Sequence, residues 1–542
     1  MQEIENKLKI NPVVYITRDI ERATGLDLDT PGYFIITNFS SFAKQLKQDR
    51  TNILLIENEE ILDTWQLMQN PKVIDFISGL DKPNILVFKN TTQIEKICKE
   101  QNWKLLNPPS ETASKIEEKI PQLEWLGDLK KYLPGYEVLQ CKDIEFKNKK
   151  FILQFNRSHT GSGTILIESA EQLKEIKNKF PNREARVANY IEGPIFTNNN
   201  ITAGDKILLG NISYQITGLQ PFTDRKFATI GNDWGVVRKI LSDEQIEEYK
   251  KQAREIGEKL IKDGWKGAYG IDVVMEASTG KMYLLEVNAR QPASMSYEST
   301  LQQLETTNNE ISSFEAHLAA LLDIDLSDYE LVEIDNGAQI IQRVTKDIQT
   351  LPDINLKNNV DFKTIKYKNK KLGNDLLRIQ MPYSIIKKHN ELNICGKQMI
   401  DFITTTKDGK TWDNDRGGII AIKNNKILLI ERHKFGRHFF SLPGGTAHKD
   451  EKILQTAKRE GKEETNLIYD IPEQTPIHIN VTGRNEYYFF VKNISGKTTL
   501  GEEESERNCP NNSYELKWVD LDELEKINLK PDGIAKIILQ KI

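Results

Sequence analysis

The stretch PGGTAHKDEKILQTAKREGKEETN, residues 443–466, decides how the C-terminal part of the chain is interpreted. From residue 453 to residue 466 it has the spacing of a helix and contains no proline. Positions three and four apart share a helix face, so Glu460, Glu463 and Glu464 crowd three carboxylates onto one patch. Mg²⁺ prefers oxygen ligands, and a rigid carboxylate cluster can hold it against a diphosphate. A solvated charged face would produce the same run of residues, so the helix alone leaves both interpretations open.

The spacing upstream of the helix favours the metal site. The pattern consists of a glycine, a glutamate, an arginine followed by a glutamate, and two further glutamates: Gly445, Glu451, Arg459, Glu460, Glu463 and Glu464. It resembles the Nudix box, and the resemblance covers about residues 413–542, including a preceding hairpin and a closing strand and helix. The resemblance implies a Nudix hydrolase domain of α/β/α architecture, which we place at residues 411–542.

By this resemblance Glu460, Glu463 and Glu464 would bind Mg²⁺, with Mn²⁺ as an alternative. These glutamates and Arg459 form the expected catalytic set, in which Arg459 fixes the rotamer of a glutamate. Glu451 is expected to support them. Water would attack a phosphorus of a nucleoside diphosphate linked to another group and split the pyrophosphate. The sequence leaves open which carboxylate acts as the base.

Two positions depart from the box. Gly461 stands where an aliphatic residue is usual, and Asn466 replaces a glycine near the end of the helix. Asparagine tolerates the left-handed conformation, so we expect the helix to end at Asn466, whereas Gly461 costs about 1 kcal/mol of helix propensity. Neither change removes a metal ligand.

A second acidic cluster is predicted in the middle of the chain. The segments GID at 270–272 and LLEVNAR at 284–290 flank a turn, ASTG, at 277–280. A three-residue hairpin loop with Gly280 at its left-handed position would set Asp272 directly across from Glu286.

Strand alternation places Glu286, Asn288 and Arg290 on one face, with Leu285 and Val287 on the other. Two facing acids require a cation. We therefore expect Mg²⁺ on Asp272, Glu286 and Asn288, and we expect Arg290 to meet a phosphate or a carboxylate.

Upstream, residues 157–164 read RSHTGSGT, a small-residue loop between two strands whose backbone N–H groups can cover phosphates. Together with the acidic cluster and the segment VANYIEG at 187–193, this loop resembles the ATP-grasp superfamily over about residues 120–330. ATP-grasp enzymes of the biotin-carboxylase-like layout also carry an N-terminal α/β domain and a β appendage.

The resemblance implies that ATP lies between two α+β lobes, with the adenine at the hinge formed by Asn189 to Ile191. The residues expected to bind ATP are Gln154, Arg157, Gly161, Ser162, Gly163, Asn189, Tyr190 and Ile191. Such enzymes usually transfer the γ-phosphate to a carboxylate, and an amine or other nucleophile then displaces the acyl phosphate. Arg290 would steady the developing charge. One departure concerns Gln154, which occupies a place where a lysine commonly meets the phosphates. Arg157 or Lys226 is expected to compensate for the missing lysine.

The rest of the chain suggests a multidomain α/β and α+β protein. Early β-rich runs separated by helical segments predict a parallel sheet: Val13 to Thr17, Tyr33 to Thr37, Asn52 to Ile56 and Asn84 to Phe88. No GxGxxG motif follows these runs, so we expect a scaffold there. The predicted domains are a pre-ATP-grasp α/β domain, an ATP-grasp domain, a small β-rich appendage and the Nudix domain: 1–118, 119–334, 335–403 and 411–542.

Composition limits the partners and the compartment. The chain has 74 basic against 79 acidic residues and a net charge of -5, so nucleic acid is not an expected partner. Its 4 cysteines form no CxxC pair, which fits a reducing compartment. We find no signal peptide and no long apolar run, and we therefore expect a cytoplasmic protein without a membrane partner. The oligomeric state stays open.

Three functional hypotheses follow. The first is a bifunctional enzyme that ligates a carboxylate to an amine or similar nucleophile and cleaves a related pyrophosphate compound. The second is an ATP-grasp ligase regulated by a Nudix domain that only senses nucleotides. The third is a Nudix hydrolase with a non-ligating ATP-binding scaffold, which Gln154 favours. The intact glutamates of the box favour the first hypothesis.

Overall fold

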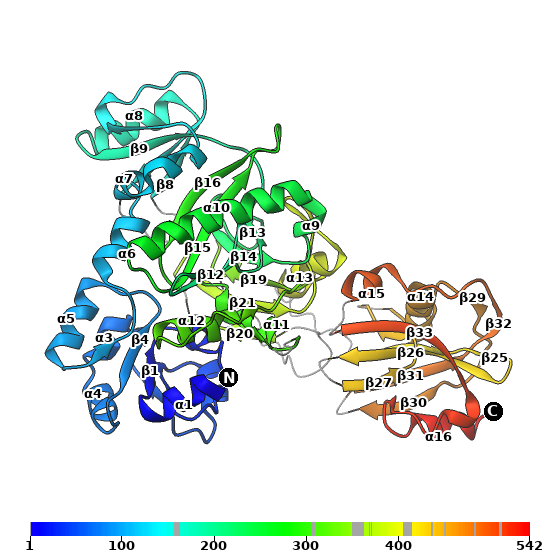
Figure 1. Ribbon diagram of the computed structural model, residues 1–542. Coiled ribbons are helices and arrows are strands. Elements are labelled where there is room, and N and C mark those ends of the chain that lie inside the picture. The colour runs from blue at the N-terminus through cyan, green and yellow to red at the C-terminus, as the bar shows by residue number, and fades with distance from the viewer. Residues whose placement is uncertain are drawn as a thin grey trace. The chain divides into compact units, whose positions relative to one another are not determined.

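A computed structural model describes residues 2–156, 163–305, 309–349, 363–367, 369, 371–404, 415–434, 437–448, 451–481, 484–508 and 512–542 (Figure 1). They form two compact units. The first contains the described residues up to 349, those among 363–381, and 388–391; the second contains 382–387 and the described residues from 392 onward. Within the described ranges no helix has both the length and the apolar character of a transmembrane span.

The N-terminal part of the first unit contains a five-stranded parallel sheet in the order β3-β2-β1-β4-β5. Its strands are β1 (Val13–Ile16), β2 (Tyr33–Asn38), β3 (Ile53–Ile56), β4 (Asn84–Val87) and β5 (Lys104–Leu105). Its helices are α1 (Gln2–Ile10), α2 (Ser41–Lys47), α3 (Thr64–Met68), α4 (Pro71–Ser78) and α5 (Thr92–Glu100). The parallel sheet predicted from the four β-rich runs is thus confirmed.

Both faces of this sheet are covered, which explains why β1 is apolar throughout. Val14 and Ile16 pack with α4 and α5, whereas Val13 and Tyr15 pack with a cluster that includes Phe314. The Tyr15 hydroxyl donates a 2.7 Å hydrogen bond to Gln291 Oε1. The N-terminal sheet therefore contacts the segment that directly follows Arg290.

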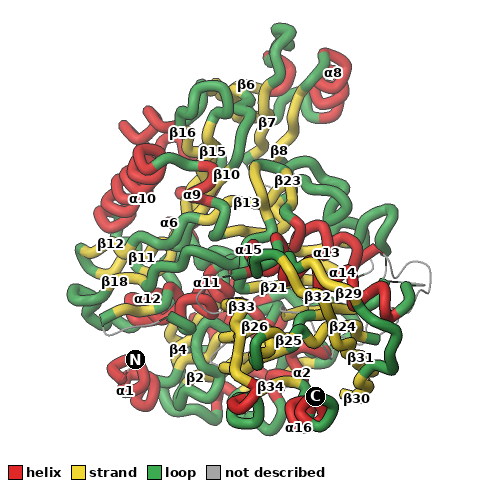
Figure 2. The backbone as a smooth tube through the Cα atoms, turned by 90° about the vertical axis from the view of Figure 1, so that its right-hand side faces the viewer, coloured by secondary structure: helices red, strands yellow, loops and turns green. Residues whose placement is uncertain are grey.

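A small antiparallel sheet follows, in the order β6-β9-β7-β8, with one face covered by α8 (Ala170–Lys179) (Figure 1 and Figure 2). Its strands are β6 (Tyr136–Gln140), β7 (Phe151–Phe155), β8 (Thr164–Ile167) and β9 (Glu184–Asn189). Phe151 and Leu153 point toward Leu173 of α8, so Gln154 lies on the opposite face. Two short helices, α6 (Ser110–Glu117) and α7 (Pro121–Leu126), precede this lobe.

A ten-stranded sheet forms the second lobe, in the order β12-β11-β15-β10-β13-β14-β19-β21-β20, with β16 paired to β15. The strands are β10 (Ile195–Thr197), β11 (Asn200–Ala203), β12 (Lys206–Leu208), β13 (Ser213–Thr217), β14 (Thr229–Asp233), β15 (Gly267–Met275), β16 (Met282–Asn288), β19 (Ala338–Arg343), β20 (Lys363–Lys366) and β21 (Asp375–Met381). Strands expected in the β appendage are present, yet β19, β21 and β20 continue this sheet instead of forming one of their own. The limits of the appendage stay a prediction.

Helix α10 (Asp243–Lys262) is a long amphipathic helix of this lobe. Ser242 and Gln245 form a capping box at its start, and its apolar residues from Ile246 to Leu260 are buried. The other elements of the lobe are α9 (Val237–Ile240), α11 (Met295–Gln302), α12 (Ser313–Leu321), β17 (Glu310–Ile311) and β18 (Glu330–Leu331).

The second unit contains α13 (Ile394–Thr404) and two packed sheets, β28-β24-β31-β30 and β25-β26-β27-β34, with β33 paired to β26. The strands are β24 (Arg416–Ile420), β25 (Ile422–Lys423), β26 (Lys426–Lys434), β27 (Arg437–Ser441), β28 (Gly444–Thr446), β30 (Ile477–Val481), β31 (Arg484–Phe490), β33 (Asn512–Asp520) and β34 (Leu529–Lys530). It also contains the short pair β29 (Ile468–Asp470) and β32 (Lys492–Ser495) and the helix α15 (Glu502–Arg507). The short strands β22 (Ile386–Lys388) and β23 (Glu391–Leu392) each include residues of both units.

Helices α14 (Ile453–Thr465) and α16 (Ile534–Leu539) lie on opposite sides of these sheets. Ile419 packs in the cluster of Ala457 from α14, whereas its neighbour Ile420 packs in the cluster of Ile534 from α16. This is the predicted α/β/α architecture.

The hairpin expected before the box turns at Asn424 and Asn425, which are both left-handed, with φ of 52° and 60°. Residues Gly418 to Ile422 do not form one continuous strand. The strand breaks at Ala421, because β24 belongs to one sheet and β25 to the other.

Candidate active sites

The first candidate site is built on the hairpin of β15 and β16. Asp272 and Glu286 are direct partners across the two strands, as predicted, and both are partly buried. Loss of water and the neighbouring Glu286 carboxylate raise the pKa of Asp272. Burial also opposes ionisation of Glu286, but the Lys119 ammonium outweighs it and lowers the pKa of Glu286. The pair therefore combines an ionised carboxylate, Glu286, with one that keeps its proton to a higher pH, Asp272.

The hairpin reaches this register by a different route from the predicted one. Glu276 N–H donates to Lys281 at 2.8 Å, so the loop holds four residues, Ala277 to Gly280, with Gly280 left-handed at φ 73°. A bulge beside Asp272 then shifts the register by one residue and restores the Asp272–Glu286 pair. The bulge also changes the alternation, because Leu284 and Val287 are buried while Leu285 is only partly so.

Two cations and a further acid surround the pair. Lys119, whose side chain is 13% exposed, contacts Glu286, and Arg290 donates a 2.8 Å hydrogen bond to Asn288 Oδ1. Glu117 Oε1 lies 3.2 Å from Arg290 Nε. The structure thus brings Asp272, Glu286, Asn288 and Arg290 together as predicted. Lys119 and Glu117 carry no sequence signal, because they lie more than 150 positions away from β16.

Arg186 on β9 is a third residue that the sequence did not single out. It is the cross-strand partner of Gln154, so both side chains lie on the face of the small sheet turned away from α8. Arg186 is 1% exposed, and among the described residues its Nε and Nη1 have no hydrogen-bond partner. Burial lowers the pKa of Arg186 to about 10, against the opposing influence of Tyr136 and of Glu286. Two buried guanidinium donors without hydrogen-bond partners are costly and point to an anion that they serve.

The other predicted nucleotide contacts fall at the ends of these strands. Gln154 Nε2 donates to Thr164 Oγ1 at 3.3 Å, and Gly163 C=O accepts the Phe155 N–H at 3.1 Å. Asn189 ends β9, and Tyr190 and Ile191 follow it. Arg157, Gly161 and Ser162 lie outside the described residues. Lys226 is 60% exposed and pairs with Glu168 at 3.8 Å, so it is less suited than Arg186 to replace the missing lysine.

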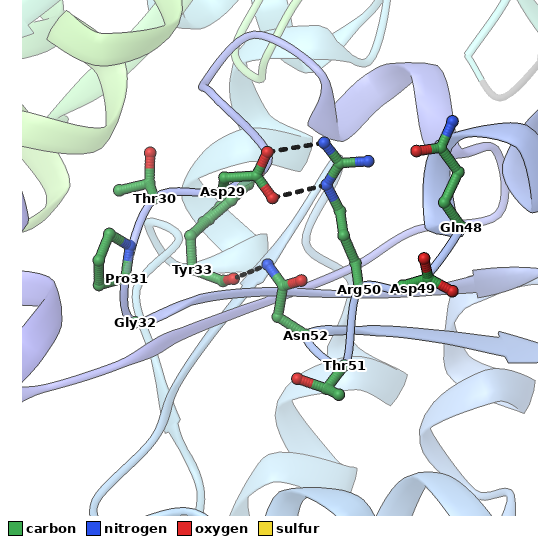
Figure 3. Close-up of a pocket in the computed structure, with 10 residues that line it drawn as sticks. All are labelled: Asp29, Thr30, Pro31, Gly32, Tyr33, Gln48, Asp49, Arg50, Thr51 and Asn52. Atoms are coloured by element: carbon green, nitrogen blue, oxygen red, sulfur yellow. Dashed lines mark hydrogen bonds and ion pairs between the residues drawn. The ribbon is translucent and has the colours of Figure 1, made fainter.

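A hollow of about 540 Å³ lies elsewhere in the first unit, beside the amino ends of β2 and β3 (Figure 3). Arg50 points into it, but Nε and Nη2 of its guanidinium each donate a 2.7 Å hydrogen bond to Asp29 (Figure 3). Ligands of open α/β sheets bind at the carboxyl ends of the strands, which is the opposite edge. We therefore assign this hollow no role.

The second candidate site is the acidic face of α14. Arg459 binds Glu451 through two hydrogen bonds of 3.0 and 2.9 Å and also donates to Glu460 at 2.7 Å and Glu463 at 3.1 Å. Glu451 also accepts from Thr456 and from the His448 N–H, and these contacts, led by Arg459, lower the pKa of Glu451 to about 2. Its oxygens are therefore occupied, which matches the predicted supporting role.

Glu460 and Glu464 face a buried acidic patch. Loss of water raises the pKa of both, and for Glu464 the buried Glu504 of α15 raises it further. Glu464 Oε2 accepts a 2.5 Å hydrogen bond from the Gly444 N–H. Arg416 of β24 interacts electrostatically with Glu464 and Glu460 and partly offsets their repulsion. Glu463 is 58% exposed and lies at the edge of the patch.

The packing of this patch explains why the first residue of the box, Gly445, is a glycine. A Cβ at Gly445 would lie 2.1 Å from Cδ of Glu460, so only glycine lets the carboxyl pack there. Sequence reasoning missed Arg416 and Glu504, which come from other elements and become neighbours of the box only in the fold.

Backbone conformation explains one of the two departures from the box, and packing explains the other. Asn466 adopts the left-handed conformation at φ 55° and ends α14, as predicted. A Cβ at Gly461 would lie 2.3 Å from the Tyr469 hydroxyl and 2.8 Å from Ile419 Cδ1. That hydroxyl donates to the Lys458 carbonyl at 3.1 Å, so Tyr469 and Ile419 fill the space of the usual aliphatic side chain.

Gly461→Ala is therefore expected to lower the free energy of unfolding by about 1–3 kcal/mol, because overpacking outweighs the gain of about 1 kcal/mol in helix propensity. Urea denaturation measures it. Lys458→Ala, at an exposed position of the same helix, should change stability by less than about 0.5 kcal/mol. An unchanged or higher stability of Gly461→Ala would contradict the packing explanation.

Comparison with known families agrees with the two sites. A family model described as the NUDIX domain matches residues 414–540, and one described as the ATP-grasp domain matches residues 116–294. The chain therefore contains an ATP-grasp domain and a C-terminal Nudix domain, which confirms both resemblances. These domains imply an ATP-dependent ligase activity and a pyrophosphohydrolase activity, and their families use Mg²⁺.

Solved structures are similar in fold to a large part of the chain. An N5-carboxyaminoimidazole synthetase from Staphylococcus aureus complexed with ADP has a TM-score of 0.51 and 13% identity, over 72% of this chain and 97% of that chain. A biotin carboxylase from Campylobacter jejuni has a TM-score of 0.50 and 12% identity, over 69% and 88%. At these identities the likeness concerns the fold alone. The comparison with curated proteins found no match.

Proposed function

We propose that the chain is a bifunctional enzyme. The first site is an ATP-dependent ligase that activates a carboxylate as an acyl phosphate for attack by an amine or similar nucleophile. The second hydrolyses a nucleoside diphosphate-linked or related pyrophosphate compound. One observation supports both proposals: each unit sets two partly or fully buried carboxylates against each other, Asp272 with Glu286 and Glu464 with Glu504, beside a fixed cation.

In the ligase site the proposed Mg²⁺ ligands are Asp272, Glu286 and Asn288. All three offer oxygen atoms, which suits Mg²⁺, and the raised pKa of Asp272 means that ion binding releases its proton. Bound Mg²⁺ would supply neutralisation of the phosphate charge. Arg290, held by Asn288 and Glu117, would face the carboxylate oxygen that accepts the γ-phosphate. The amine then attacks the acyl carbon, and phosphate leaves.

Arg186 supplies, in this proposal, the phosphate contact that Gln154 cannot make. It occupies the strand next to Gln154, points to the same face, and lies close enough to Glu286 for the two charges to interact. Phosphate oxygens would satisfy the Nε and Nη1 donors that lack partners. The buried charge would then be compensated only when nucleotide is bound.

Arg186→Met is expected to weaken MgADP binding by about 10–100-fold, as for the loss of charge-assisted hydrogen bonds of roughly 1.5–3 kcal/mol. Its thermal stability without nucleotide should be unchanged or higher, because an unpaired buried charge is removed. Isothermal titration with MgADP and thermal denaturation measure these two effects. Arg183→Met, at an exposed arginine over Phe155 on the α8 side, is the matched control and should bind normally.

A second substitution tests directly whether Arg186 takes the place of the lysine that is missing at Gln154. Adding Gln154→Lys to Arg186→Met should restore a large part of the MgADP affinity, since the lysine would reach the same face from the neighbouring strand. Loss of stability in Arg186→Met together with normal MgADP binding would show that Arg186 only packs.

In the Nudix site the proposed Mg²⁺ ligands are Glu460, Glu463 and Glu464, and Glu504 is added because its carboxylate faces Glu464. These oxygen-only donors fit Mg²⁺, which would supply Lewis-acid activation of a phosphorus. Arg459 positions Glu460 and Glu463 through the hydrogen bonds described above. One of these carboxylates accepts the proton of the attacking water.

A screen with ATP, Mg²⁺ and pools of carboxylic acids and amines tests the ligase, with ADP release and product mass measured together. ADP released only with one acid, and a product with the mass of that acid plus the amine less one water, would support ligation and identify the substrates. ADP release that no acid stimulates would instead favour the scaffold hypothesis. A Nudix domain that binds nucleotides but cleaves none of a panel of nucleoside diphosphate derivatives would favour the sensor hypothesis.

A further inference from the structure

A cluster of two histidines and a glutamate lies on the Nudix sheet that contains β26 and β27, on the face turned away from α14. His433 of β26 and His438 of β27 are direct cross-strand partners, and Glu431 lies two residues before His433 on the same face. One possible ligand atom from each of the three side chains lies within 4.8 Å of the others. Glu431 is buried, while both histidines are exposed. Leu429 and Phe440, on this face, pack in the cluster of α16, so the box glutamates lie on the other side of the sheet.

We propose that Glu431, His433 and His438 bind a divalent transition metal, Zn²⁺ foremost, at a site separate from the two Mg²⁺ sites. Imidazole nitrogens suit Zn²⁺ and its neighbours, whereas Mg²⁺ prefers oxygen donors. Two histidines and one glutamate are a ligand set that leaves one position of a tetrahedral ion open to water or to another ligand. The proposal is independent of the hydrolase chemistry.

The carboxylate is already oriented for this role. Glu431 Oε1 lies 2.8 Å from His438 Nε2, and its Oε2 contacts the ammonium of Lys517. Burial opposes ionisation of Glu431, but Lys517 and His438 outweigh it and lower the pKa of Glu431. Glu515 lies 3.6 Å from Lys517 Nζ and offsets its charge from the other side. Lys517 thus holds one oxygen and leaves the other facing the histidines, as an outer partner of a metal ligand does.

The imidazoles need only a local rearrangement. Their rings stack with centroids 4.3 Å apart and an angle of 8° between planes. Tetrahedral Zn²⁺ with bonds of about 2.0–2.1 Å brings ligand atoms to roughly 3.4 Å from one another. The rings must therefore turn out of the stack toward Glu431. The side chain of His438 is 50% exposed, so this turn meets little packing resistance.

Co²⁺ titration of the metal-stripped full chain, in excess Mg²⁺ to fill the carboxylate sites, tests the proposal. We expect one equivalent of Co²⁺ to give the visible absorption of a four-coordinate ion, and one equivalent of Zn²⁺ to displace it. His433→Ala or His438→Ala should weaken Co²⁺ binding by more than about 100-fold, and Lys517→Ala by about 10-fold. His478→Ala, at an exposed histidine of β30 in the same domain, is the matched control and should leave binding unchanged.

Circular dichroism should show that every variant stays folded, because the substituted histidines are exposed. Absence of Co²⁺ binding under these conditions would overturn the proposal. So would binding that both histidine variants retain. Binding that Glu464→Gln abolishes would place the ion at the Nudix box and would overturn it as well.

Discussion

Glu464→Gln is expected to lower Mg²⁺-dependent pyrophosphate cleavage by more than about 100-fold while ATP-dependent ADP formation stays within about twofold of the unmodified chain. Glutamine keeps the size of the side chain but removes the charge that a direct ligand provides, and even outer partners of metal ligands are worth about 10–100-fold. Cleavage is measured as phosphate or mononucleotide released from a panel of nucleoside diphosphate derivatives. Glu473→Gln, at an exposed glutamate of the same domain, should cleave normally.

The same substitution has a consequence for stability. The pKa of Glu464 is raised above its ordinary 4.5 in the folded state, so metal-free protein should lose stability as the pH rises from about 4.5 through the raised value. Glu464→Gln should flatten this fall, and saturating Mg²⁺ should do so in the unmodified chain because the ion replaces the proton. Urea denaturation across pH measures the effect. Unchanged cleavage by Glu464→Gln would refute the assignment of the box.

Glu286→Gln should have the opposite selectivity, lowering ADP formation by more than about 100-fold and sparing pyrophosphate cleavage. The substitution removes the ionised member of the Asp272 pair and leaves Lys119 without its carboxylate partner. Coupled measurement of ADP release with the acid identified in the screen gives the rate. Glu247→Gln, at an exposed glutamate of α10, is the matched control.

The other outcomes for Glu286→Gln are also informative. A normal rate of ADP formation would mean that the first unit binds nucleotide without using this pair. If both activities fell together, the variant would have lost its fold, and thermal denaturation would detect that loss. Only a selective fall in ADP formation supports the ligase proposal.

Local sequence patterns were enough to predict the parts of the fold that depend on residues close together in the chain. The apolar run of β1, the helix from residue 453 and the left-handed Asn466 follow from side-chain periodicity and backbone preference. The pair of Asp272 and Glu286 was also predicted correctly, although the loop length was not, because the bulge beside Asp272 compensates for the extra loop residue.

The remaining features depend on contacts between distant segments. Nothing about Lys119 in the sequence indicates that it meets Glu286, and nothing about Arg186 shows that its Nε and Nη1 are buried without hydrogen-bond partners. The passage of the chain from one sheet to the other at Ala421 is likewise set by pairing with strands far along the chain. Such contacts can be identified only when the positions of the strands in the fold are known.

The bond between Tyr15 and Gln291 bears on where the chain can be divided. Arg22 reinforces it by donating to the Ala293 carbonyl at 3.0 Å and accepting at its own carbonyl from Gln291 and Ser296. A cut at residue 118 would leave Asp272, Glu286 and Asn288 in place, yet it would sever Glu117 from Arg290 and release the segment that follows Arg290. The N-terminal domain thus holds the segment that follows Arg290 in place, and dividing the chain there would separate that segment from the residues that hold it.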